Sequence, residues 1–136
     1  MDSRYQQLLN AYKTAGGDLE ILKDVDIAHL MVHGNEVCSS RVIPGLHMEA
    51  KQKPEGVDLD FVMKSSFKYE NPINICFGLI PKRGIQRINL TGKVEDNAGV
   101  KILAYCIFPN AVDITHIMAA NVKVGDNSFF DYRENH

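Results

Sequence analysis

Tryptophan is absent from this sequence of 136 residues, and aromatic residues account for only 8% of it. Proteins that recognise nucleic acids rely on stacking aromatic side chains and on a basic surface, whereas the net charge here is −2. A surface that binds anionic membranes also needs an excess of basic residues. The composition therefore predicts no nucleic acid and no membrane as a partner.

Long apolar runs are missing as well. The stretch from Ile73 to Ile80 is far shorter than the roughly 20 residues that span a bilayer, and the polar segment from Met1 to Lys13 lacks the apolar core of a secretory signal. The cysteines Cys38, Cys76 and Cys106 are an odd number at wide spacings, which is typical neither of a disulfide framework nor of a CxxC metal site. We therefore expect a cytoplasmic protein with reduced thiols.

One helix is predicted, at the N-terminus. Four apolar residues follow the i, i+3, i+4, i+7 spacing of an amphipathic helix: Tyr5, Leu8, Leu9 and Tyr12. Gly16 and Gly17 then supply the left-handed backbone that stops a helix. We assign residues 1–17 to an N-terminal capping helix that packs on the remainder of the chain.

Residues 18–136 show the two-residue period of β-strands. One clear run alternates apolar with mostly polar positions at Val57, Leu59, Phe61 and Met63. Similar runs follow in Ile73–Leu79 and Ile88–Val94, and two more strands are expected after Asp96-Asn97 and Asp126-Asn127. No second helix is predicted, so the chain is expected to be mainly β.

The turns between these strands repeat. The segment Lys93–Ala98 recurs thirty residues later as Lys123–Ser128, and Lys64–Phe67 is a weaker copy about one repeat earlier. A period of this length is typical of solenoids, and strands alone in each repeat favour a parallel β-helix, with a β-sandwich as the alternative. We assign residues 18–136 to this core and expect it to be truncated at its C-terminal end, as a dimer or as a fragment.

Two residues of the predicted core are candidates for chemistry. Cys106 shares a strand face with aliphatic residues, so it is either a small buried hydrophobe or a metal-binding thiol. His116 lies on a predicted inward face, where most histidines are core residues. Stacked coils would nevertheless bring His116 close to Cys106. Glu134 and His136 share one face of the last strand, and cysteine, histidine and carboxylate together suit iron or a transient cluster.

Other polar groups give weaker indications. Cys76 is predicted to lie on the face opposite Ile75 and Phe77, either against the helix or at the surface. His29 and His33 either share a strand face or flank a turn, and the second interpretation is preferred. Asp58 and Asp60 form the one same-face acidic pair that a carbohydrate-active β-helix enzyme could use, although they equally suit a solvent-facing strand.

Several segments resemble the SufB/SufD family, in particular its short archaeal-type members or an N-terminal fragment of one. The similar segments are Tyr5–Tyr12, Asp26–Leu30, Val42–Leu46, Ala104–Ala111, His116–Met118, Val124–Asn127 and Tyr132–His136. The resemblance implies a right-handed parallel β-helix core. The sequence lacks the N-terminal cysteine motif seen in many SufB proteins, and it ends before the helical region through which the family is expected to dock its ATPase.

The resemblance implies a scaffold subunit for iron–sulfur cluster assembly in a SUF-type complex, and no enzyme. The expected partners are a SufC-like ABC-type ATPase and a second SufB/SufD-type subunit, in a homo- or heterodimer joined through β-helix edges. Iron or a transient cluster would be held by Cys106, His116, Glu134 and His136. The alternative is a β-helix protein-interaction module without cluster chemistry, whose thiols are inert.

Overall fold

The computed structural model describes residues 3–136, so residues 1 and 2 of the predicted helical segment lie outside the described part. These residues form an N-terminal α-helix, a short 3₁₀ helix and β-strands. Their bounds are α1 Ser3–Thr14, η1 Leu19–Leu22, β1 His29–His33, β2 Glu36–Arg41, β3 Leu46–Lys53, β4 Gly56–Met63, β5 Ile73–Gly78, β6 Arg83–Val94, β7 Gly99–Ile107, β8 Asp113–Val124 and β9 Phe129–Asn135. The prediction of a mainly β chain with one short N-terminal α-helix is confirmed. The 3₁₀ helix was not predicted, because four residues are too few to show a helical period.

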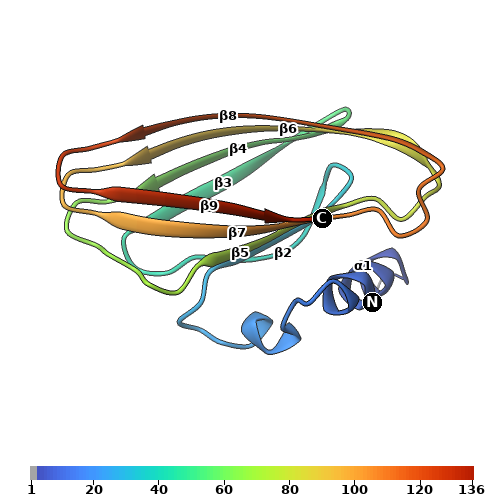
Figure 1. Cartoon of the computed structure of the whole chain (residues 1–136), viewed down its shortest axis with the longest axis horizontal. Helices are drawn as coiled ribbons and strands as arrows, with labels where there is room; N and C mark the ends of the chain where they lie inside the picture. The colour runs from blue at the N-terminus through green and yellow to red at the C-terminus, as the bar shows by residue number, and fades with distance from the viewer. Residues whose placement is uncertain (1–2) are drawn as a thin grey trace.

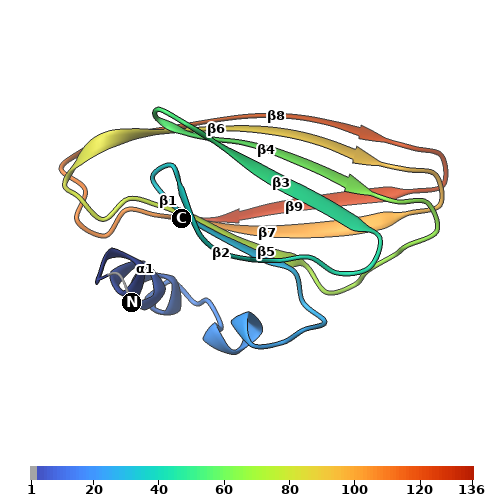
Figure 2. The same cartoon turned by 180° about the vertical axis from the view of Figure 1, so that it is seen from behind.

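The strands form two sheets that stack face to face (Figures 1 and 2). One sheet has the order β2-β1-β5-β7-β9 and the other the order β3-β4-β6-β8. Alternate side chains of each strand point between the sheets, where they form the main core. Among the bulky side chains buried there are those of Leu59, Phe77 and Ile102.

From β4 onward the chain crosses to the other sheet after every strand, and each of the strands β6 to β9 pairs in parallel with the strand two before it. In the β6–β8 pair Lys93 lies beside Lys123, and in the β7–β9 pair Ile102 lies beside Tyr132. Both pairs are offset by thirty residues, so the thirty-residue repeat of the sequence corresponds to one full circuit of the chain through both sheets.

The repeated turns stack on one another at one end of the sheets. Asn97 and Asn127 both adopt the left-handed backbone, with φ of 60° and 55°, and Asn127 Nδ2 donates to Asn97 Oδ1 at 2.8 Å. The backbone N–H of Asp126 donates to Asp96 Oδ1 at 2.7 Å. Ser66, in the weaker copy of the repeat, has a φ of 74°. The prediction that these repeated segments are turns between strands is therefore confirmed, and asparagine suits them because it tolerates the left-handed backbone.

The first strands depart from the expected parallel stacking. β2 pairs with β1, and β3 with β4, in antiparallel orientation, so both sheets are mixed. The prediction that every coil stacks in parallel is wrong for these two strands. The physical reason lies in the connections, since Gly34-Asn35 and Pro54-Glu55 leave two residues between the paired strands, and such short loops join only antiparallel neighbours.

Helix α1 covers the outer face of the five-stranded sheet. Its buried residues Leu8, Leu9 and Tyr12 pack against a second group of sheet residues that includes Met31, Cys76 and Tyr105. The helix ends at Thr14, and two residues later Gly16, with a φ of 103°, adopts the predicted left-handed backbone. No helix within residues 3–136 combines the length and the apolar character needed to cross a membrane. The division into a capping helix, 1–17, and a core, 18–136, stays a prediction.

Candidate functional site

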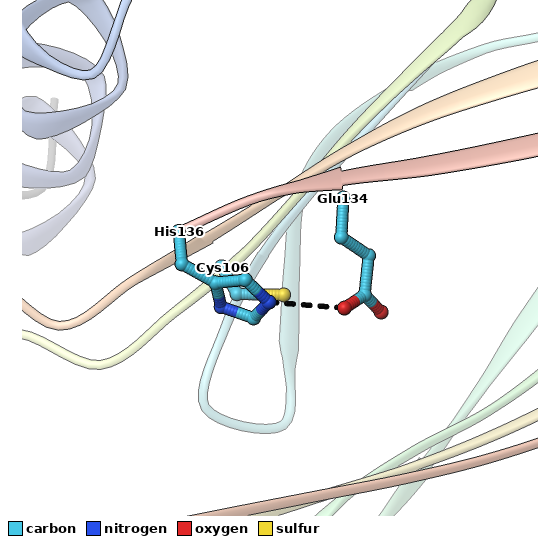
Figure 3. A group of neighbouring side chains, drawn as sticks. All are labelled: Cys106, Glu134 and His136. Carbon is cyan, nitrogen blue, oxygen red and sulfur yellow. Dashed lines mark hydrogen bonds and ion pairs between the residues drawn. The ribbon is translucent and has the colours of Figure 1, made fainter.

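Three of the four predicted site residues lie together at the end of β7 and β9. Glu134 is on β9, His136 follows that strand directly, and Cys106 is on β7. The β7–β9 register places Ala104 beside Glu134 and Tyr105 beside Asn135, so its next position brings Cys106 to His136. One ligand atom from each of Cys106, Glu134 and His136 lies within 4.8 Å of the other two (Figure 3). We call these three residues the thiol–carboxylate–imidazole group.

Hydrogen bonds hold the carboxylate of this group in its charged form. The Tyr132 hydroxyl donates to Glu134 Oε1 at 2.7 Å, and His136 Nε2 lies 3.0 Å from Glu134 Oε2. The bond from Tyr132 is the main reason that the pKa of Glu134 is lowered, with a smaller effect of His136. Burial, followed by the same hydrogen bond, raises the pKa of Tyr132. Glu134 is therefore a carboxylate at neutral pH.

The thiol of the group is buried and protonated. Cys106 is 4% exposed, and burial followed by the nearby charge of Glu134 raises its pKa to about 12. A metal ion that binds this sulfur must therefore displace a proton. The side chains of His136 and Glu134 are 63% and 33% exposed, so a buried sulfur is combined with two ligands that reach solvent.

The fourth predicted residue, His116, lies on β8 of the other sheet and is not part of the close group. Its ring is half-buried, with centroids 5.2 Å from Phe108 and 6.5 Å from Phe77. Nδ1 lies 3.1 Å from Oε1 of Gln86, whereas Nε2 is buried and bonded to none of the residues that the structure describes. Burial lowers the pKa of His116, with smaller and opposing effects of Glu134, which raises it, and His136, which lowers it.

A pocket of about 430 Å³ lies between α1 and the end of β7, and the group opens onto it. Its walls come from α1, from β7 with the loop that follows, and from the end of the chain. They include Gln7, Asn10, Ala11, Thr14, Cys106, Phe108, Asn110 and His136. Because Cys106 and His136 both line the pocket, it provides a route from solvent to the buried sulfur.

The remaining polar candidates lie elsewhere. Cys76 is fully buried beneath α1, so the first of its two predicted positions is confirmed. His29 and His33 are the two ends of β1, and the preferred interpretation, that they flank a turn, is wrong for His29. Its Nε2 lies 2.7 Å from Ser39 Oγ. Asp58 is engaged by Asn89 and Lys53 on the four-stranded sheet.

Two residues beside the site were missed. Tyr132 shares the face of Glu134 at the two-residue period, so its position could have been inferred from the alternation alone. Gln86 is fully buried and lies directly beside His116 in the β6–β8 register. The thirty-residue repeat relates Gln86 to His116. The neighbouring residues Ile85 and Arg87, however, do not indicate that the side chain of Gln86 points inward.

Fold and site thus define a two-sheet β protein that carries a thiol–carboxylate–imidazole group at one end of a sheet. The chain is 30% identical to an iron–sulfur cluster assembly SufBD family protein of Pyrococcus horikoshii, over 97% of this chain and 40% of that protein. It is also 30% identical to a protein of the same description from Methanocaldococcus jannaschii, over 78% of this chain and 36% of the relative. No family model and no solved structure matches it.

The chain belongs to the SufBD family. It spans less than half the length of either relative.

Proposed function

We propose that this chain serves as a scaffold for iron–sulfur cluster assembly and that its thiol–carboxylate–imidazole group holds iron or a nascent cluster for a short time. The observation that carries this proposal is the convergence of Cys106, Glu134 and His136 within 4.8 Å. The family to which the chain belongs supports it, because both relatives bear iron–sulfur cluster assembly in their descriptions.

The chemistry of the ligands suits an iron cargo. Thiolate and imidazole favour iron and other borderline or soft ions, whereas magnesium and calcium prefer oxygen ligands alone. The high pKa of Cys106, about 12, means that the site is a masked one: the ion must expel the thiol proton as it binds. Because the proton competes with the ion for the sulfur, such a site binds the ion more weakly and releases it more readily than one with a standing thiolate, which fits temporary storage.

His116 is proposed as a fourth ligand. Its buried Nε2 has no partner among the described residues, and the charges of Glu134 and His136 both affect its pKa. The exposed side chains of Glu134 and His136 can move toward it without disturbing the core.

The fold is proposed to be the start of a right-handed parallel β-helix. The alternation of β4 to β9 between two sheets supports this assignment. β8 and β9 are the last strands of the two sheets within the described residues, so their outer edges offer backbone groups to a second SufB/SufD-type subunit. A SufC-like ATPase and a cytoplasmic location complete the proposal, with the chain acting as scaffold and not as catalyst.

The alternative of an interaction module with inert thiols is not favoured, because Cys106 is bordered by ionisable ligands and by a pocket. Cys76, in contrast, lies among apolar and aromatic side chains under α1 and has the surroundings expected of an inert core thiol.

Anaerobic reconstitution with Fe²⁺ and sulfide tests the function. The chain is purified together with the SufC-like ATPase, and an absorption spectrum and an iron count are then measured. Both should reveal a labile cluster in the wild type and in Cys76→Ala. Cys106→Ala should give neither cluster absorption nor bound iron while circular dichroism shows an intact fold. Equal iron in both variants would contradict the site assignment.

A further inference from the structure

We propose that Gln86 is a positioning residue for the metal site: its amide fixes the tautomer of His116 so that Nε2 offers a lone pair to an ion held by Cys106, Glu134 and His136. The inference rests on the proposed function and adds to it a residue that does not bind the ion itself but orients one of the ligands. It also specifies what binds first: a single divalent ion that is held by four protein ligands.

The orientation of the Gln86 amide is determined by its neighbours. Gln86 is 0% exposed, so its polar atoms cannot be satisfied by bulk water. Its Nε2 donates to two backbone carbonyl oxygens, that of Gly34 at 3.0 Å and that of Gly78 at 3.3 Å. A rotated amide would direct its oxygen at both carbonyl oxygens, which repel it, and would remove this donor from each of them; the carbonyl oxygen of Gly78 would keep only the bond from the Gly34 N–H, at 2.8 Å. The oxygen of Gln86 must therefore face His116.

This orientation decides which nitrogen of His116 carries the proton. Oε1 of Gln86 lies 3.1 Å from Nδ1 of His116 and can only accept a hydrogen bond. Nδ1 is therefore the donor, and in the neutral ring Nε2 keeps an unprotonated lone pair.

The lone pair on Nε2 of His116 accepts no hydrogen bond from the described residues. Nε2 of His116 is buried and bonded to none of the described residues. An orphaned buried acceptor costs about 1–3 kcal/mol, which a metal ion at Nε2 would recover. Metal-bound histidines commonly donate from their other nitrogen to a fixed acceptor, and the pair of Gln86 and His116 reproduces that arrangement.

The ligand set assigns the class of ion. One sulfur, one carboxylate oxygen and two imidazole nitrogens suit a four-coordinate divalent ion such as Fe²⁺, Co²⁺ or Zn²⁺. The buried Cys106 and the half-buried His116 come from facing sheets, and the exposed side chains of Glu134 and His136 lie at the end of β9, where they can close over an ion.

Nitrogen NMR of the metal-free protein tests the tautomer. Long-range correlation spectra of ¹⁵N-histidine protein at pH 7.5 should show His116 with a protonated Nδ1 and an unprotonated Nε2. In Gln86→Met, which removes the acceptor, the ring should change to the other tautomer or to a mixture. A protonated Nε2 in the wild type would overturn the inference.

Titration with Co²⁺, read from its visible and sulfur-to-metal absorption, tests the role in binding. We expect the Kd to rise about 10–100-fold in Gln86→Met, the usual effect of losing a partner behind a metal ligand, and at least as much in His116→Ala. Asn74→Ala, which removes another buried amide far along β5, should leave the Kd unchanged.

The two proposals fail separately. If the wild type binds Co²⁺ through Cys106 and neither Gln86→Met nor His116→Ala alters the Kd or the spectrum, the inference is wrong and the proposed three-residue site stands. If Cys106→Ala binds as tightly as the wild type, the proposed site itself is wrong, and Gln86 has no metal to position.

Discussion

Replacing Cys106 by alanine separates what this thiol contributes to the fold from what it contributes to metal binding. Cys76 provides the matched control, because it is equally buried, its pKa is also raised to about 12, and it lies in the neighbouring strand of the same sheet. The two sulfurs differ in surroundings: that of Cys76 packs under α1, and that of Cys106 lies beside Glu134 and His136.

The size of the expected effects follows from burial and from linkage. Each substitution deletes one buried sulfur from a packed interior, which costs about 1 kcal/mol in the free energy of unfolding. An ion at 100 times its Kd stabilises the folded state by about 2.7 kcal/mol. Losing a direct ligand should weaken binding by at least the roughly 100-fold that losing an outer partner can cause, which leaves only about 0.4 kcal/mol.

Thermal unfolding under anaerobic conditions, with and without Co²⁺, measures this difference. For a chain of this size 1 kcal/mol corresponds to about 4 °C, so the wild type and Cys76→Ala should each gain about 10 °C on adding the ion. Cys106→Ala should gain about 1–2 °C. All three proteins should be of similar stability, within about 1 kcal/mol, without metal.

A gain of about 10 °C in Cys106→Ala would refute the reasoning, because the ion would then bind without the thiol. Equal loss of the gain in both cysteine variants would also refute it, since that result would place the effect in general packing and not in the group at the end of β7 and β9.

Two further predictions concern the fold. Burial, and then the charge of Arg41, lowers the pKa of His29 below its ordinary value of 6.5. The unfolded chain therefore binds a proton first on acidification, so the free energy of unfolding is at its full value above pH 6.5 and falls below it. Urea unfolding of His29→Gln should show a shallower fall over this range, and parallel curves would contradict the assignment. Asn127→Ala should lose about 1–2 kcal/mol by the same measurement because of the left-handed φ of 55°, whereas Asn127→Gly should lose less, and equal losses would show that φ is not the cause.

The sequence predicted the parts of this fold that depend on local pattern. Alternation located the strands around Val57–Met63 and Ile73–Leu79, and the recurring Asp-Asn turns revealed the thirty-residue period. These turns stack because Asp96 accepts from the backbone N–H of Asp126 and Asn127 donates to the side chain of Asn97. The antiparallel β2 and β3 were missed, since pairing direction is set by loop length and by the partner strand and is not written in either strand's own residues.

The candidate site was predicted in its membership but not in its geometry. Cys106, Glu134 and His136 were chosen for their chemistry, and the β7–β9 register brings them together. The separate place of His116 could not be foreseen, because it depends on the distance between two stacked sheets. Gln86 was missed for a related reason: a buried glutamine is recognised only when its hydrogen-bond partners are known.

The register explains why no compact ligand motif appears in this sequence. His136 follows Cys106 by thirty residues and His116 follows Gln86 by thirty, so each pair is one circuit of the chain and is adjacent only after folding. The arrangement is costly, because it keeps a protonated thiol next to a carboxylate and an imidazole nitrogen buried without a partner among the described residues. Apolar side chains at both positions would fill the same space without that cost. The cost is explained if the two groups await a common ion, and the pocket beneath α1 gives that ion a way in.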